Sequence, residues 1–171
     1  MPVYELNQIR PLIGDGTWIA PSAAIIGDVT IGTNCYIGFG AVIRGDFGSI
    51  IIGNETLIED NVVIHTASGT KIGNRVIVGH MAMIHDAHIE DGALIGMQAM
   101  VSEGAVIGAD AIIAQQSLLK KNQKIPSRNL YAGAPAAFKK EVSDEYLEIM
   151  DAGIRAYMEL RKLYHQTFKP V

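Results

Sequence analysis

The sequence predicts an all-β solenoid that is followed by a single α-helix. Three observations predict it: an aliphatic residue recurs every six residues, small residues recur four positions after it, and helical spacing replaces the repeat after Ser143. A six-residue period matches neither the 3.6-residue turn of a helix nor the two-residue alternation of an ordinary strand. It matches a coil of short strands with a turn in every six residues.

The aliphatic residue defines position one of each six-residue unit, or hexad. All eighteen members of the series are Ile, Val or Leu, and we expect them to point inward and to stack on the next coil. Three hexads form one triangular coil. The members are Ile19, Ile25, Ile31, Ile37, Ile43, Ile52, Ile58, Ile64, Ile72, Val78, Ile84, Ile89, Ile95, Val101, Ile107, Ile113, Leu119 and Ile125.

Two further positions of the hexad follow a pattern. Position five is small or β-branched, which lets the corner of the coil close, as at Ala23, Val29, Cys35, Ala41, Thr56, Val62, Val76, Ala82, Ala93, Ala99, Ala105, Ala111 and Ser117. Position two is often glycine, and there we expect backbone angles that other residues avoid. Those glycines are Gly32, Gly38, Gly53, Gly73, Gly79, Gly96 and Gly108.

The repeat ends near Pro135, which predicts a β-solenoid over residues 1–135. Residues 136–171 are expected to form a linker and an α-helix that packs on the solenoid. Ser143 is the expected N-cap, and Asp144 and Glu145 suit the first helical turn. Apolar residues then recur at helical spacing up to about Gln166.

Composition narrows the classes of function. The chain of 171 residues has a net charge of −4 and no basic block, so we expect no nucleic-acid partner. A single cysteine, Cys35, suits a reducing cytosol and fits a packed position. Neither a signal peptide nor an apolar stretch of membrane-spanning length is visible, so we expect a cytoplasmic protein without a membrane partner.

The repeat register places two histidines in one column. With the hexad of Ile43 taken as face A, Arg44, His65 and His85 hold position two on face A of three successive coils. Coils stack about 4.8 Å apart, so two imidazoles in this column can reach one metal ion at about 2.0–2.1 Å each. His80 holds position three on face C and should not easily reach the same ion within one chain. A second chain would solve this geometry.

Several motifs together resemble the γ-class carbonic anhydrases of the hexapeptide-repeat proteins. They are Arg44-Gly45-Asp46, Glu59-Asp60-Asn61, Ile64-His65 and the segment Gly79 to His85. The opening residues 1–5 and residues 44–48 resemble most closely a branch named for phenylacetate degradation and the carnitine operon, which shares its pattern with ferripyochelin-binding-like proteins. The hexapeptide pattern covers roughly residues 10–135, and the resemblance implies a left-handed parallel β-helix.

The resemblance also implies a metal site and a reaction. His65 and His85 of one chain and His80 of its neighbour would hold Zn²⁺ at a homotrimer interface, with Fe²⁺ or Co²⁺ as alternatives. Zinc-bound hydroxide would attack carbon dioxide to give bicarbonate, which is a carbonic anhydrase or lyase activity. Arg44 and Asp46 match an Arg-x-Asp motif that supports the interface and orders the site.

Two candidate catalytic residues have alternative interpretations. Glu59 stands where the family prototype has glutamine, and it is either a proton acceptor at the site or a surface acid. Tyr157 matches a tyrosine that shorter family members bring to the pocket, and simple helix packing is the alternative. The loops after Asp46 and after His65 hold no evident proton-shuttling glutamate, so slow or absent turnover is expected.

Two other classes of function stay open at this point. One is an acyl-CoA thioesterase or hexapeptide acyltransferase, for which Lys120, Lys121 and Lys124 could bind the coenzyme, although a solvated edge is the commoner meaning of such a cluster. The other is a non-catalytic, metal-binding trimeric scaffold.

Overall fold

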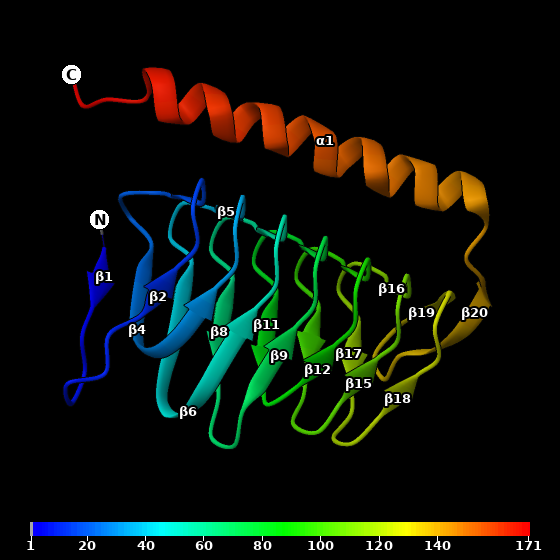
Figure 1. The fold of residues 1–171 in the computed structure, drawn as a ribbon. Coiled ribbons are helices and arrows are strands. Elements are labelled where there is room, and N and C mark those ends of the chain that lie inside the picture. The colour runs from blue at the N-terminus through cyan, green and yellow to red at the C-terminus, as the bar shows by residue number, and fades with distance from the viewer. Residues whose placement is uncertain (1) are drawn as a thin grey trace.

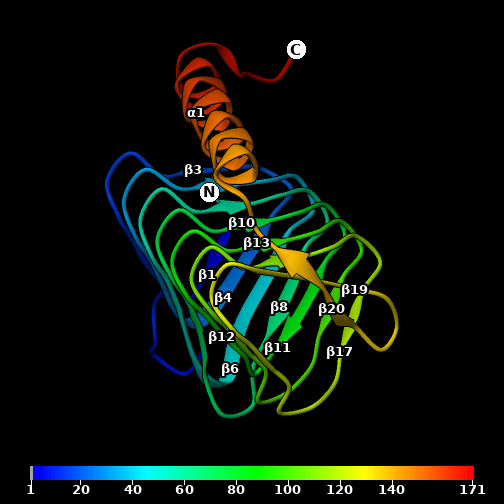
Figure 2. The same ribbon diagram turned by 90° about the vertical axis from the view of Figure 1, so that its right-hand side faces the viewer.

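The chain folds into a triangular prism of stacked coils with one helix along its length (Figures 1 and 2). The computed structural model describes residues 2–171, and Met1 lies outside the described residues. About seven turns of parallel strands form a left-handed β-helix, which confirms the predicted fold class. No helix among residues 2–171 is both long and apolar enough to cross a membrane.

The strands form two sheets that wrap the prism. Twelve strands cover faces A and B: β1 (Val3–Tyr4), β2 (Leu12–Ile13), β4 (Ala24–Ile31), β6 (Val42–Ile52), β8 (Val63–His65), β9 (Thr70–Ile72), β11 (Met83–His85), β12 (His88–Ile89), β14 (Met100–Val101), β15 (Val106–Ile107), β17 (Leu118–Leu119) and β18 (Lys124–Ile125). Eight cover face C: β3 (Trp18–Ile19), β5 (Tyr36–Ile37), β7 (Leu57–Ile58), β10 (Ile77–Val78), β13 (Leu94–Ile95), β16 (Ile112–Ile113), β19 (Asn129–Ala132) and β20 (Ala137–Glu141).

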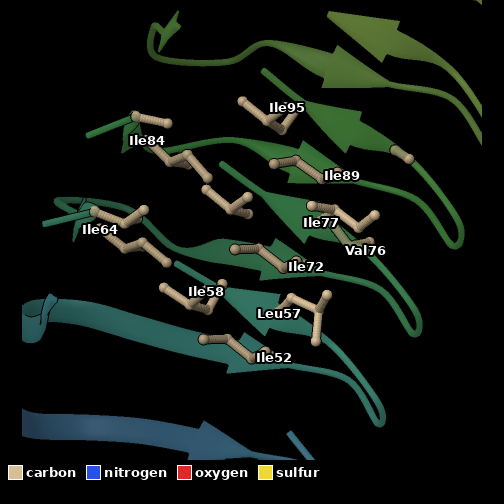
Figure 3. Close-up of a cluster of buried hydrophobic side chains, with 14 of the residues drawn as sticks. Ile52, Leu57, Ile58, Ile64, Ile72, Val76, Ile77, Ile84, Ile89 and Ile95 are labelled. Carbon is tan, nitrogen blue, oxygen red and sulfur yellow. The ribbon is translucent and has the colours of Figure 1, made fainter. Parts of the chain in front are cut away.

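The observed register confirms the hexad assignment. Ile43 pairs with Ile64, and Ile64 pairs with Ile84, so position one repeats on face A of successive coils. All eighteen position-one residues are buried. Figure 3 shows part of this core, with the aliphatic side chains of each coil stacked on those of the next. Removing this apolar surface from water is the main favourable contribution to the fold.

The expected role of the position-two glycines is wrong. None of the seven has a positive φ; the left-handed backbone occurs instead at position four, as at Asn34, Asn61 and Gly104. Position two is glycine because the next coil lies too close for a side chain: a Cβ on Gly38 would lie 2.7 Å from the backbone nitrogen of Asp60. Position four favours Asn and Gly because both tolerate left-handed angles.

The helix α1 (Asp144–Thr167) begins at the N-cap Ser143, as predicted. It runs back along the prism toward the N-terminal coils (Figure 1). Met150 and Ile154 are buried against the prism. Near the other end, Tyr164 packs on Trp18 with ring centroids 4.5 Å apart. The segment expected to be a linker contains strand β20, which pairs antiparallel with β19.

Candidate metal centre

The repeat is irregular at the corner between faces A and B, directly after the predicted column. There the step between position-one residues is nine from Ile43, eight from Ile64 and five from Ile84. Strand pairing aligns Arg44 with His65 and His65 with His85, so the column predicted from the register is confirmed.

The two histidine rings of the column present nitrogen atoms to each other. His65 Nδ1 and His85 Nε2 are 3.2 Å apart. Two nitrogen ligands on one tetrahedral zinc ion, each at about 2.0–2.1 Å, are separated by about 3.3–3.4 Å. The pair therefore fits two neighbouring ligand positions of such an ion.

Each of these histidines has a carboxylate at its other ring nitrogen. His65 Nε2 is 2.8 Å from Asp46 Oδ1, and His85 Nδ1 is 3.2 Å from Asp86 Oδ2. A histidine that binds a metal usually donates its second N–H to such an acceptor, which fixes the tautomer. The lone pairs of the two facing nitrogens are then free for a cation.

Asp46 also forms an ion pair with Arg44. Desolvation raises the pKa of the Asp46 carboxyl, but hydrogen bonds from His65 and Arg44 outweigh it and hold the pKa below its usual range. Arg44 and Asp46 thus lie beside the histidine pair, where the sequence analysis placed them. They orient His65 within a single chain, whereas their expected contribution to a subunit interface stays a prediction.

The sequence allows two interpretations of Asp86, which follows His85: an acceptor that orients the imidazole, or a solvated turn residue. Its side chain is only 4% exposed. Desolvation raises its pKa, but hydrogen bonds from Ser68, Thr66 and Ala67 prevail and hold the pKa far below the usual range.

His80 lies at the opposite edge of face A, in the turn between β10 and β11. The backbone N–H of Asp60 donates to His80 Nδ1 at 3.2 Å, and His80 Nε2 is 3.2 Å from Glu59 Oε2. Within residues 2–171 of one chain, no three His, Cys, Asp or Glu side chains lie close enough to form a metal site. The structure therefore brings two of the three predicted ligands together and leaves the third apart.

Glu59 and Tyr157 join His80 in a second group. Glu59 is 8% exposed, and its Oε2 accepts the backbone N–H of His80 at 3.1 Å. Burial raises the pKa of Tyr157 above its usual value, and the charge of Glu59 and a hydrogen bond to it add to this rise. Tyr157 also packs edge-on against Tyr36, with centroids 5.0 Å apart, as the helix-packing interpretation expects, and its role at the site stays a prediction.

Apolar surface lies between and around these two groups. A pocket of about 380 Å³ beside Glu59 and His80 has the apolar residues Ile77, Leu94 and Met97 in its lining. We define the methionine strip as five exposed apolar residues, three on face A and two in the turns at its edge: Val63, Met83, Met100, Met81 and Met97. A contiguous apolar surface of this kind is typical of an interaction site.

Comparisons with known proteins agree with the repeat. The family model described as bacterial transferase hexapeptide (six repeats) matches residues 10–45 and 86–121. A solved hexapeptide transferase family protein from Anaplasma phagocytophilum superposes with a TM-score of 0.92 and 34% identity, covering 95% of this chain and 97% of that one. The fold therefore defines the chain as a hexapeptide-repeat protein.

Similarity to named proteins identifies the family to which this chain belongs within the hexapeptide-repeat proteins. Gamma carbonic anhydrase 2, mitochondrial, of Arabidopsis thaliana is 39% identical across 90% of this chain, which spans only 58% of that protein's length. The probable carbonic anhydrase of Methanocaldococcus jannaschii is 43% identical, covering 87% of this chain and 95% of that protein. Carnitine operon protein CaiE of Escherichia coli O157:H7 is 34% identical, covering 94% and 83% respectively. The chain belongs to the γ carbonic anhydrase family of hexapeptide-repeat proteins.

Proposed function

We propose that this protein is a γ-carbonic-anhydrase-like metalloenzyme that converts carbon dioxide to bicarbonate at a zinc site. The observation that carries the proposal is the histidine pair: two nitrogens 3.2 Å apart, each ring backed by a carboxylate. Zinc suits neutral histidine ligands, and Fe²⁺ or Co²⁺ could occupy the same donor set.

The proposed working unit is a homotrimer in which His80 of one chain completes the site of the next. His80 and the His65–His85 pair occupy opposite edges of face A, so a ring of three identical interfaces would bring them together. The methionine strip between these edges supplies apolar surface for such an interface. Proteins of this fold are generally trimeric, which supports the proposal.

In the proposed reaction, the metal would supply the nucleophile, and side chains of the protein would orient the ligands and accept a proton. When bound by three neutral histidines, zinc supplies a water-derived nucleophile near neutral pH that adds to carbon dioxide. Asp46 and Asp86 hold the two rings so that the facing nitrogens keep their lone pairs. Glu59 lies against His80 and gives a buried carboxylate that can accept a proton. Burial and then the negative charge of this carboxylate raise the pKa of Tyr157, whose side chain lies close to Glu59.

Three measurements on the purified protein test this proposal: metal content, native mass, and stopped-flow hydration of carbon dioxide with and without added zinc. We expect zinc-dependent hydration by a trimer, and loss of both metal and activity in His65→Ala. His88→Ala is the matched control, because His88 lies on face B and pairs with Lys71 rather than with the column. Absence of metal-dependent hydration in the intact protein would reject the enzyme proposal.

The pocket beside Glu59 and His80 favours a second candidate, an acyl-CoA thioesterase or acyltransferase. Its apolar lining suits an acyl chain, and a hexapeptide transferase family protein is among the solved structures similar to this chain. Hydrolysis or transfer of an acyl-CoA that persists in His65→Ala would support this candidate over metal chemistry. A metal-loaded trimer inactive in both assays would support the scaffold instead.

A further inference from the structure

We infer that Asp86 is a positioning residue that sets the tautomer of His85 and the spacing between His85 and His65. This inference rests on the proposed metal site, since it assigns Asp86 a role toward that metal. The two oxygens of the Asp86 carboxylate have different partners, and the difference gives the residue its role.

One oxygen is held by the turn that follows His65. Asp86 Oδ1 accepts hydrogen bonds from the Thr66 hydroxyl at 2.6 Å, from the Ala67 N–H at 2.7 Å and from the Ser68 N–H at 2.8 Å. The Thr66 oxygen in turn accepts the N–H of Gly69 at 2.7 Å. With three donors on one oxygen, the carboxylate cannot rotate without breaking this turn.

The other oxygen faces the histidine. Asp86 Oδ2 lies 3.2 Å from His85 Nδ1. A carboxylate oxygen at this distance favours the tautomer in which Nδ1 carries the proton and Nε2 keeps its lone pair. Nε2 is the atom that faces His65 at 3.2 Å. The fixed carboxylate therefore selects the tautomer that a metal ion requires.

The backbone of Asp86 adds a third constraint. Its φ is +50°, in the left-handed region that is uncommon for a residue with a side chain. Its N–H donates to the carbonyl of His65 at 3.4 Å, and its carbonyl accepts from the N–H of Gly104 at 2.7 Å. These backbone hydrogen bonds connect the coil of Asp86 to the coils of His65 and Gly104, next to the two candidate ligands His65 and His85.

The variant Asp86→Asn tests this role. Its oxygen can still accept the three donors, so its amide NH₂ must face His85 Nδ1, which then has to accept and moves the ring proton to Nε2. We expect zinc affinity, measured by chelator competition on the folded protein, to fall by about 10–100-fold. In the metal-free protein, ¹⁵N chemical shifts of His85 should report the change of tautomer. Wild-type zinc affinity with an unchanged tautomer would overturn the inference.

Two further variants separate positioning from folding. Asp86→Gly suits the positive φ but also removes the acceptor of three donors, so it should lower both thermal stability and zinc affinity. Thr66→Val removes one donor to Oδ1 and leaves the contact of Oδ2 with His85, so it should lower thermal stability with zinc affinity near wild type. If the wild-type protein binds no zinc, the proposed site fails, whereas the tautomer in the metal-free protein still decides the role of Asp86.

Discussion

The two edges of face A present their histidines in different ways. At the edge toward face B, His65 and His85 direct nitrogens at each other and have carboxylates only at the opposite ring atoms. At the edge toward face C, both nitrogens of His80 are engaged, one by the N–H of Asp60 and the other by Glu59. At the proposed site, the first edge would bind a cation without rearrangement, whereas His80 would have to exchange its contact with Glu59 before it could act as a ligand.

In the proposed trimer, the two edges would contribute to the site in different ways. Side chains stacked in a column are held by strand pairing, so a single chain can set their spacing. A ligand on the other edge would be placed by the docking of a second chain, and in the single chain it needs another partner to satisfy its polar atoms. Glu59 is that partner for His80 in the single chain.

The largest expected effect comes from removing one histidine at either edge. His65→Ala and His80→Ala should each reduce zinc affinity by more than the roughly 10–100-fold typical of an outer partner, because each removes a direct ligand. Metal analysis of the purified trimer measures this. His80→Ala with normal metal content would refute the three-histidine site and leave the two edges functionally unrelated.

The next effect concerns the surface between the edges. Met83→Glu places a charge in the methionine strip, at a side chain that is 36% exposed in the single chain, so the chain should fold but the trimer should dissociate. Sedimentation or native mass measures the change, and bound zinc should fall with it. The matched control is Ile149→Glu on α1, where an equally apolar residue is 61% exposed and outside the strip. A trimer that persists in Met83→Glu would contradict the proposed interface.

Sequence periodicity was sufficient for the architecture and for the column. Because strand pairing enforces the hexad register, counting from Ile43 placed Arg44, His65 and His85 correctly. Counting could not decide whether Asp86 is an acceptor for His85 or a solvated turn residue, because its burial depends on how a shortened corner folds against the turn of the coil below. It also misassigned the position-two glycines, since the distance to the next coil does not follow from one coil's sequence.

A smaller effect is expected at the edge of His80, where Tyr157→Phe removes the hydroxyl near Glu59 but keeps the ring against Tyr36. We expect a loss of about 1 kcal/mol in the free energy of unfolding, measured in urea, with metal content unchanged.

The pH dependence of this variant has a defined sign. Burial and Glu59 raise the pKa of folded Tyr157 above its ordinary value of 10.0. The stabilisation from its bound proton is therefore complete below about pH 10 and is lost as the pH rises above it. Wild-type stability should fall more steeply than that of Tyr157→Phe above pH 10. Parallel curves would mean that the tyrosine titrates alike in the folded and unfolded chains.

The smallest effect is expected at Cys35, which lies in the core at position five and belongs to neither edge. It is fully buried, its Sγ contacts the carbonyl of Gly53 at 3.0 Å, and burial raises the pKa of its thiol. Alanine occupies the same hexad position at Ala41 and Ala82, so Cys35→Ala should cost no more than about 1 kcal/mol. The native thiol should resist Ellman's reagent until the chain unfolds, because the reagent needs an accessible thiolate. Rapid labelling of the native protein would contradict the burial of Cys35. Loss of zinc in Cys35→Ala would mean that the core affects the proposed metal site, whereas unchanged zinc content would mean that this site depends on the edges of face A alone.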